Sequence, residues 1–484
     1  MTLFGRTQEQ TLLNTLIASK QAEFLAIYGR RRVGKTLLIN TLNTNSRIFF
    51  SVTGLKDGDL TAQLTLFANA LSQCFLNDMP ISPAPSWMEA FEQLTRQMAL
   101  VPKNKKMLLF FDELPWLATN KSGLLQALDH YWNTRWSTMP NVKLIVCGSA
   151  ASWMLDHLIN AKGGLHNRIT RSLKLEPFDL SESQGFLNSR GIKLSNKHLL
   201  DLYMVTGGVP FYLEQINKRE SVVQNIQRLC FTEQGLLWDE FPRLFRALFS
   251  QAETNLKLIT HIAQTRSGLS REALIKATNI PSGGNLNKRL TELEASGFIT
   301  RYVPYGHQKR NTYYRVVDEY TLFYLSWIAP WKASNHSLSA THWLDEYKKP
   351  AWSSWAGFAF EGICLKHVER IRAALKLNNI GCRYGSWRLS ANKAKQVDGT
   401  QIDLLIDRDD EVITLCEIKY SQKPFVIDKA YGKNLMHKID SFSEHTKTPK
   451  RIMLAMITTQ GIKTNLWSEE LVQLSISLDD IMRA

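Results

Sequence analysis

A short apolar segment followed by a loop bracketed by two glycines constrains the fold of this chain more than any other feature. Residues 24–28 read Phe-Leu-Ala-Ile-Tyr, and the next eight read Gly29-Arg-Arg-Arg-Val-Gly34-Lys35-Thr36. An apolar segment with helical character follows directly. Strand, G-x-x-x-x-G-K-[ST] and helix in this order predict a phosphate-binding loop at the end of a strand in a parallel sheet.

The loop has a defined chemistry. Its glycines let backbone N–H groups turn inward around phosphates, and the start of the next helix adds positive potential. Lys35 is expected to reach the β- and γ-phosphates, and Thr36 to ligate Mg²⁺. The alternative is a glycine-rich turn with a surface lysine, which the flanking strand and helix disfavour. ATP and Mg²⁺ are therefore the expected cofactors.

Two further apolar, strand-like runs end in polar residues. One ends in Asp112 and Glu113. Asp112 is expected to complete the Mg²⁺ shell, and Glu113 to orient or deprotonate the attacking water. Alone, such a run is typical of a strand entering a capped turn, but the upstream phosphate loop favours the catalytic interpretation. The other ends in Ser149, which either contacts the γ-phosphate or the water, or simply forms a Gly-Ser turn.

These motifs resemble those of bacterial and archaeal AAA+-related (STAND-like) P-loop ATPases with a winged helix and a C-terminal nuclease-like domain, over nearly the whole chain. The resemblance implies further nucleotide contacts. From the residues alone, Arg168 is better explained as a surface ion-pair partner, and Gly207-Gly208-Val-Pro210 as a turn between helices. Whether Arg168 acts on its own chain or on a neighbour stays open. The matching positions are Phe4-Gly5-Arg6 with Glu9 (entry motif near the adenine), Asp112 to Trp116 (Walker B extension), Gly148-Ser149 (sensor strand), Asn167-Arg168 (arginine position) and Gly207-Gly208-Val-Pro210 (lid motif).

The run from Asn255 to Arg315 has another pattern. Three helical faces, then two strand-like runs about a Pro-Tyr-Gly turn, predict a winged helix-turn-helix. The alternative for such a module is a protein-interaction or intramolecular lid role. The residues expected to contact DNA are Lys288 and Arg289 on the third helix and Lys309 and Arg310 at the wing tip.

The last third of the chain contains two apolar runs about a charged turn, which predict a β-hairpin. If Asp407 and Ile413 flank the turn, Asp403 lies opposite Glu417, with Cβ atoms ~5 Å apart. Opposed carboxylates in a central hairpin are costly unless a cation such as Mg²⁺ bridges them. Lys419 lies on the same side of its strand, where it would position water or stabilise the charge of the phosphate.

This hairpin is similar to the PD-(D/E)xK nuclease signature, although Ile402 stands in place of the usual proline. The resemblance makes Asp403, Glu417 and Lys419 catalytic, and it implies another metal-ligating acid on a preceding helix, which matches Glu361. A bare E-x-K is also typical of a surface ion pair. Residues 365–395 carry eight Lys and Arg against one Glu, which suits a polyanion channel or a solvated basic surface.

Length and composition agree with several domains. The chain has 484 residues, beyond the ~250–300 at which one core stops growing. With 59 Lys and Arg against 44 Asp and Glu, its charge of +15 suits a nucleic acid partner but is also compatible with a basic protein that has none. Scattered cysteines, no secretory leader and no apolar run of ~18 residues predict reduced thiols and the cytoplasm, without a membrane partner.

We therefore expect an α/β protein of four parts. The expected function is that of an ATP-hydrolysing, DNA-directed protein with a Mg²⁺-dependent nuclease-like domain, and the resemblance alone implies a defence or mobile-element setting. The alternatives are a regulatory ATPase whose nuclease-like domain binds without cutting, or an ATP-driven protein-remodelling module; homo-oligomerisation stays open. The expected parts are a P-loop parallel-sheet core (1–180), a helical lid (181–245), a winged helix-turn-helix (246–335) and a small α/β restriction-endonuclease-like domain (336–484).

Overall fold

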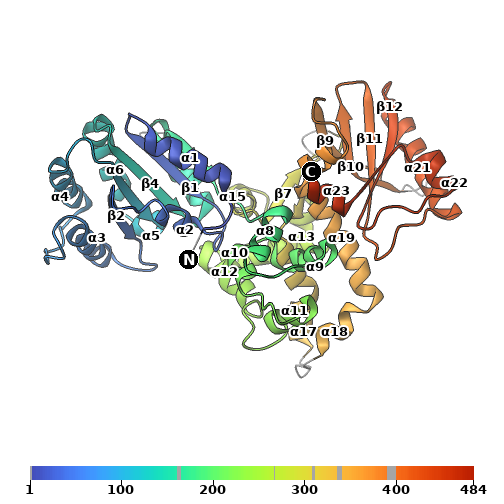
Figure 1. The fold of residues 1–484 in the computed structure, drawn as a ribbon, viewed down its shortest axis with the longest axis horizontal. Helices are drawn as coiled ribbons and strands as arrows, with labels where there is room; N and C mark the ends of the chain where they lie inside the picture. Colours follow the sequence, from blue (N-terminus) through green and yellow to red (C-terminus); the bar gives the residue numbers. More distant parts are fainter. Residues whose placement is uncertain (1–2, 161–164, 266–267, 308–310, 335–340, 390–398) are drawn as a thin grey trace. The chain divides into compact units, whose positions relative to one another are not determined.

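The chain forms two compact units (Figure 1). The first comprises Met1–Pro177 with Val209–Phe211, and the second Phe178–Gly208 with Tyr212–Ala484. Each unit has its own sheets and core and is described by itself. The computed structural model describes residues 3–484 except 161–164, 266–267, 308–310, 335–340 and 390–398.

The first unit is built on a five-stranded sheet of order β2-β3-β4-β1-β5, in which every neighbouring pair is parallel. The central strands β3 and β4 are buried along their whole length, as expected when helices cover both faces of a parallel sheet. The predicted P-loop strand is confirmed. The strands are β1 Glu23–Tyr28, β2 Ile48–Thr53, β3 Met107–Asp112, β4 Val142–Gly148 and β5 Arg171–Lys174; the α-helices are α1 Thr7–Ala18, α2 Lys35–Asn40, α3 Leu60–Phe75, α4 Trp87–Ala99, α5 Leu114–Leu117, α6 Leu124–Thr134 and α7 Ala151–Met154.

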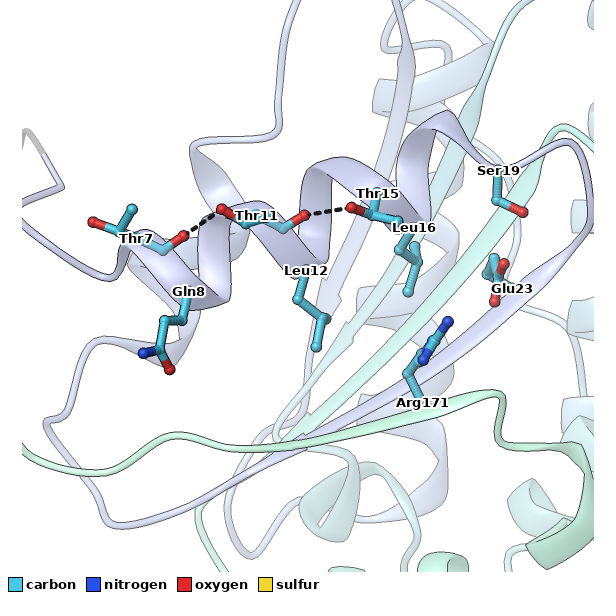
Figure 2. Close-up of a pocket in the computed structure, with 9 residues that line it drawn as sticks. All are labelled: Thr7, Gln8, Thr11, Leu12, Thr15, Leu16, Ser19, Glu23 and Arg171. Atoms are coloured by element: carbon cyan, nitrogen blue, oxygen red, sulfur yellow. Dashed lines mark hydrogen bonds between the residues drawn. The ribbon is translucent and has the colours of Figure 1, made fainter. Parts of the chain in front are cut away.

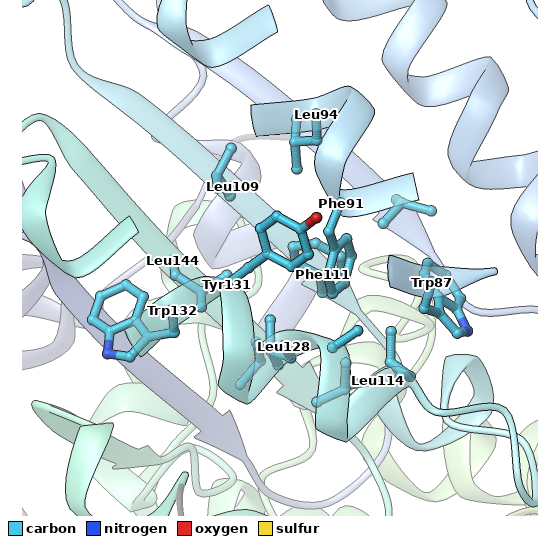
Figure 3. Packing of buried hydrophobic residues seen from close by; sticks show 14 of the residues in the cluster. Trp87, Phe91, Leu94, Leu109, Phe111, Leu114, Leu128, Tyr131, Trp132 and Leu144 are labelled. Atoms are coloured by element: carbon cyan, nitrogen blue, oxygen red, sulfur yellow. The ribbon is translucent and has the colours of Figure 1, made fainter. Parts of the chain in front are cut away.

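One face of this sheet packs an aromatic-rich core (Figure 3). Phe91 of α4 meets Phe111 of β3 edge to face, with ring centroids 5.8 Å apart. Trp136 donates from its indole nitrogen to Thr95 at 2.9 Å, so its buried polar group is satisfied. The opposite face packs a second, aliphatic cluster with residues of α1 and α2. The two cores hold the carboxyl ends of β1, β3 and β4 in fixed register.

The second unit begins with helices and continues with a small three-stranded sheet of order β6-β8-β7, whose pairs are antiparallel. Ser270 caps the helix that begins at Arg271, since its hydroxyl accepts from the Ala273 amide at 3.2 Å. We call β7 and β8 the wing strands. The α-helices before this sheet are α8 Leu180–Ser189, α9 Asn196–Thr206, α10 Pro210–Glu214, α11 Val222–Cys230 and α12 Glu240–Leu248; α13 Ala252–Ala263, β6 Leu269–Ser270, α14 Arg271–Thr278, α15 Gly284–Ala295, β7 Ile299–Tyr302 and β8 Tyr313–Val316 follow.

The same unit ends in a five-stranded mixed sheet of order β13-β12-β11-β10-β9. The hairpin register is the predicted one: Asp407 pairs with Ile413, and Leu404 with Cys416. One further step along this register would set Asp403 opposite Glu417, and the charge of Glu417 acts on the Asp403 carboxyl. The elements are α16 Glu319–Phe323, α17 Ala329–Ala333, α18 His342–Tyr347, α19 Pro350–Lys366, α20 Val368–Ala374, β9 Cys382–Leu389, β10 Thr400–Arg408, β11 Val412–Lys419, α21 Lys429–Thr446, β12 Arg451–Thr458, α22 Leu466–Leu471, β13 Leu474–Ser477 and α23 Leu478–Arg483.

Two sequence-level expectations concern the whole chain. All six cysteines are free thiols, as predicted, and four of them are buried. Within the ranges that the structure covers, no helix is long and apolar enough to cross a membrane.

Candidate functional site

The P-loop joins β1 to α2, and its two glycines serve different purposes. Gly29 has φ 142°, and a Cβ there would lie 2.3 Å from the Leu175 carbonyl oxygen, so only glycine allows this approach of two backbones. Gly34 has φ 94° and open space around it, and it caps the start of α2. Glycine is therefore needed at position 34 for its backbone conformation, because a left-handed backbone is costly for other residues.

Lys35 lies within the curve of this loop. Its side chain is nearly buried, and its ammonium donates to the carbonyl oxygens of Gly29 at 3.0 Å and Arg30 at 2.8 Å. Phosphate oxygens can replace these carbonyls as acceptors. Arg6, also buried, donates to the Val33 carbonyl at 3.1 Å and so braces the loop from the N-terminal side.

Thr36 and Asp112 are brought together as the sequence predicted. The Thr36 hydroxyl donates to the Asp112 carboxylate at 2.8 Å. Thr36 is exposed, whereas Asp112 is buried at the end of β3. A hydroxyl and a carboxylate in this arrangement are the oxygen ligands that a nucleotide-bound Mg²⁺ takes in P-loop proteins.

Glu113 has the backbone geometry of a constrained site residue. Its φ of 47° and ψ of 51° are left-handed, which is unusual for a non-glycine residue. Its carboxylate accepts from both the backbone N–H and the hydroxyl of Ser149, at 3.0 and 2.9 Å. Ser149 thus contacts Glu113, an interaction that the sequence analysis missed. The sequence held a signal for this contact, because each residue directly follows an apolar, strand-like run. The two strands pair in parallel and therefore end at the same edge of the sheet.

The other residues predicted to contact the nucleotide are Arg168 and Pro210. Arg168 is exposed, in a short 3₁₀ turn of the first unit. Pro210 begins α10, and Val209–Phe211 belong to the same compact unit as the P-loop. The guanidinium of Arg32 lies 4.5 Å from the centroid of the Phe211 ring, which links this short segment to the loop.

A hollow of about 660 Å³ in the first unit is not part of this site (Figure 2). It lies along α1, and Glu23 and Arg171, which also line it, stand at the starts of β1 and β5. Ligands of open parallel sheets bind at the opposite, carboxyl ends of the strands. The hydroxyls of Thr11 and Thr15 in this hollow donate to carbonyls of their own helix, at 2.7 and 2.8 Å.

The second candidate site is the hairpin of β10 and β11. Glu417 is buried and accepts from Lys419 at 2.9 Å and Lys438 at 2.7 Å. Burial acts to raise the pKa of Glu417, but the two ammonium groups outweigh it and hold the pKa below its usual value. Burial, and then the charge of Glu417, raise the pKa of Asp403 to about 6. The two carboxyls are therefore shifted in opposite directions, and Asp403 is the one that takes up a proton first as pH falls.

Two residues of α21 were missed by the sequence analysis. Lys438 and Tyr431 both reach Glu417, the latter through a hydroxyl that donates at 2.5 Å. They are seven residues apart, which places them on one face of a helix. Two polar residues at this spacing on a helix that follows the E-x-K strand were the available signal.

The carboxylates of Glu361, Asp403 and Glu417 offer oxygen atoms, which are the ligands that a hard divalent cation such as Mg²⁺ prefers. Glu361 on α19 and Asp403 line one hollow. However, both oxygens of Glu417 are already bound by Lys438, Lys419 and Tyr431. In the part of the chain that is described, no three His, Cys, Asp or Glu side chains are grouped as metal ligands. Glu361 and Asp403 would hold an ion first, and Glu417 only after Lys438 moves.

The structure describes two of the four residues predicted to contact DNA, and they differ in exposure. Lys288 is exposed on α15. Arg289 is instead buried, and its guanidinium pairs with Glu292 at 3.0 Å. It shares the inward face of α15 with Leu286 and Leu290, so in this structure it cannot reach a nucleic acid. Lys309 and Arg310 lie outside the described residues.

Three basic residues in the described part of the segment at 365–395 form ion pairs within the protein. Lys366 pairs with Glu319 at 3.1 Å, and Arg370 with Asp179 at 2.8 Å. Arg383 pairs with the Asp407 carboxylate at 3.2 Å. These acids are distant in sequence, so the local count of one Glu could not reveal them. The pairs weaken the prediction of a polyanion channel along this segment.

Comparison with known proteins locates the nucleotide chemistry in the N-terminal part. Residues 3–216 match the family described as an ATPase domain predominantly from Archaea. An uncharacterized protein of Methanocaldococcus jannaschii is 24% identical over 428 residues, which cover 86% of this chain and 87% of that protein.

Solved structures give weaker likenesses. A Walker-type ATPase of Pyrococcus abyssi is 19% identical, covering 67% of this chain and 96% of that chain, with a TM-score of 0.47. For the Aeropyrum pernix ORC2 protein with ADPNP and ADP, the identity is 14%, the coverage 69% and 96%, and the TM-score 0.40. TM-scores below 0.5 do not establish a shared fold. The family match and the loop geometry together identify residues 3–216 as a P-loop ATPase domain.

Proposed function

We propose that this chain is a Mg²⁺-dependent ATPase directed to nucleic acid, with a nuclease-like site in its C-terminal part. The observation that carries the ATPase assignment is the contact between Thr36 and Asp112 at 2.8 Å, beside Lys35. Two motifs far apart in the chain thereby form one site, which suits Mg²⁺ and a triphosphate better than either motif alone.

Each residue of this site has a role in the proposal. Lys35 and the loop amides gather the phosphates, while Thr36 and Asp112 provide oxygens to Mg²⁺. The ion, when bound, neutralises charge that develops on the phosphates. Glu113 then orients or deprotonates water, and Ser149 fixes the direction of the Glu113 carboxylate.

Nucleic acid is the proposed target for two reasons. The net charge of +15 favours a polyanion. The elements from α13 to β8 are those that a winged helix-turn-helix requires, and Lys288 is exposed on its third helix. Asp403 and Glu417 interact through their charges and Lys419 pairs with Glu417, which supports a nuclease-like role for the sheet that follows.

A second candidate is a regulatory ATPase whose nuclease-like domain binds without cutting. One observation favours it: Lys438, Lys419 and Tyr431 occupy the oxygens of Glu417. A carboxylate held in this way is a structural group until these partners are displaced.

Parallel assays separate the two candidates. ATP turnover and cleavage of single- and double-stranded DNA and RNA are measured with Mg²⁺ and Mn²⁺ for wild type, Lys35→Ala and Asp403→Ala. Lys35→Ala should lose ATP turnover, and Asp403→Ala should lose only cleavage. Exposed Lys56→Ala and Asp409→Ala are the matched controls. Equal cleavage by wild type and Asp403→Ala would refute the nuclease assignment, and absence of cleavage in every sample would favour the regulatory ATPase.

A further inference from the structure

Arg315 on the wing strand β8 reaches the nuclease-like site of the same compact unit. It lines the hollow that Glu361 and Asp403 also line, whose volume is about 40 Å³. Arg315 also lines a neighbouring hollow of about 280 Å³ with Tyr384 and Leu404. Arg315 therefore lines both the space beside the two carboxylates and the larger space.

The wing rests directly on the C-terminal sheet. The backbone N–H of Tyr305, just beyond β7, donates to the Ser386 carbonyl of the edge strand β9 at 2.7 Å. The Tyr305 ring lies 5.9 Å from that of Phe442. The guanidinium of Arg388, from β9, lies 5.5 Å from the centroid of the Tyr313 ring on β8. These contacts hold the wing strands beside the edge strand β9 of the C-terminal sheet.

The surroundings of Arg315 are those of a counter-ion. Its guanidinium lies over the Tyr302 ring at 4.8 Å. Burial lowers the pKa of Arg315, and the charges of Tyr302, Glu361 and Asp403 oppose that effect. The Tyr302 ring and the charges of the two carboxylates that line the same hollow together offset the cost of burying this arginine. The wing thus supplies to the site a positive charge that the E-x-K signature does not contain.

Protein cations already surround the carboxylates of the site. Three carboxylates stand near four protein cations, so a divalent ion that enters competes with these cations for the carboxylates. The hollow beside the carboxylates has room for a few water molecules and not for a phosphodiester. The carboxylates are Glu361, Asp403 and Glu417, and the cations are Arg315, Arg388, Lys419 and Lys438.

We propose that Arg315 belongs to the nuclease-like site as its resident counter-ion, and that the wing must withdraw before a divalent cation and a nucleic acid enter. This inference rests on the proposed nuclease-like function. It makes the winged helix a gate on the site as well as a module for binding nucleic acid. Arg315 and the divalent ion compete for Glu361 and Asp403.

The test is metal affinity, measured without any substrate. Binding of Mn²⁺ to the intact, nucleotide-free protein is followed by the loss of the free-ion paramagnetic resonance signal, and the Asp403-dependent site is defined by subtracting Asp403→Asn. Arg315→Gln should bind Mn²⁺ at this site at least about tenfold more tightly, because a competing charge is gone. Arg315→Lys, which keeps the charge, should stay close to wild type.

Arg301→Gln is the matched control, since Arg301 on β7 is exposed and pairs with Glu294. It should bind Mn²⁺ as wild type does. Unchanged or weaker affinity in Arg315→Gln, with the Asp403-dependent site present in wild type, would overturn the gate and leave the proposed function standing. No Asp403-dependent Mn²⁺ binding in any variant would instead remove the proposed nuclease-like site.

A second test of the gate uses the wild-type protein alone. Saturating Mn²⁺ should speed hydrogen exchange of the Tyr305 amide, because withdrawal of the wing breaks its bond to Ser386. The amide of Leu454, in strand β12 of the same sheet, serves as the reference. If exchange at Tyr305 stays constant while the Asp403-dependent site fills, the wing does not move and the proposal is wrong.

Discussion

The Thr36 hydroxyl donates to the Asp112 carboxylate at 2.8 Å, across 76 positions of sequence. This contact fixes the distance between the phosphate loop and the end of β3. Because the metal ion of a P-loop site is held between these two elements, the relationship prepares the oxygens that Mg²⁺ requires. Four substitution experiments follow from this geometry and from the ion pairs of the second unit.

Thr36→Val should reduce the affinity for Mg²⁺ in ATP turnover by about ten- to a hundredfold, because valine keeps the shape of threonine but provides no oxygen ligand. The measurement is a titration of ATP turnover with Mg²⁺ at fixed ATP. Thr44→Val, in an exposed loop, is the control. An unchanged Mg²⁺ dependence in Thr36→Val would exclude the hydroxyl as a ligand.

Glu113→Gln should bind ATP as wild type does and turn it over at least about a hundredfold more slowly, because the amide cannot accept a proton from water. Ser149→Ala should have a smaller effect of about tenfold. It removes one of the two hydrogen bonds to Glu113, while the backbone N–H of residue 149 still donates at 3.0 Å. Nucleotide affinity and turnover are measured separately. Turnover at the wild-type rate in Glu113→Gln would contradict the assignment.

The sequence predicted the sites whose residues are close together or whose register is set by a turn. The loop from Gly29 to Thr36 is local, and the charged turn before β11 fixes the pairing of Asp407 with Ile413. Strand ends could also be predicted, because polar residues after apolar runs collect at one edge of a parallel sheet.

Contacts made across the fold could not be predicted from local patterns. Arg289 looked available for DNA because the basic residues near it are consecutive, yet helical spacing turns it inward to Glu292. Lys438 of α21 pairs with Glu417, and Arg315 of β8 lines a hollow with Asp403, although no motif connects these elements to the hairpin. Charge partners of this kind are set by tertiary packing alone.

The ion pair between Asp179 and Arg370 should make stability depend on acid pH. Burial acts to raise the pKa of Asp179, but the Glu182 amide and Arg370 outweigh it, so the pKa lies below its usual value. A depressed carboxyl pKa stabilises the folded state above the unfolded value, near pH 4, and this contribution is lost as pH falls through the folded pKa.

Arg370→Met should therefore lower the free energy of unfolding by about 0.5–1 kcal/mol at pH 7, a small value because about a third of the Asp179 side chain is exposed. The difference from wild type should shrink below about pH 4. Urea unfolding at several pH values is the measurement. The control is Arg372→Met, whose partner Glu369 is 65% exposed. If the loss of unfolding free energy in Arg370→Met grew as pH fell, it would contradict the predicted pH dependence of this ion pair.

Lys438→Met should destabilise the protein by about 2–3 kcal/mol near pH 7, since it removes one of two cations from a buried carboxylate. In Glu417→Gln the same lysine change should cost less, which gives a coupling energy of at least about 1 kcal/mol in a double-mutant cycle. Lys433→Met, an exposed lysine of the same helix, is the control. Strictly additive effects would mean that the contact at 2.7 Å contributes no stability.

The central claim is that the P-loop of this chain binds a magnesium nucleotide, and calorimetric titration of ATP with Mg²⁺ into the intact protein tests it most directly. Wild type should take up one nucleotide per chain, and Lys35→Ala should lose at least about a hundredfold in affinity, because the ammonium that faces the phosphates is gone. Absence of nucleotide uptake by wild type at millimolar ATP, or equal affinity in Lys35→Ala, would contradict the account.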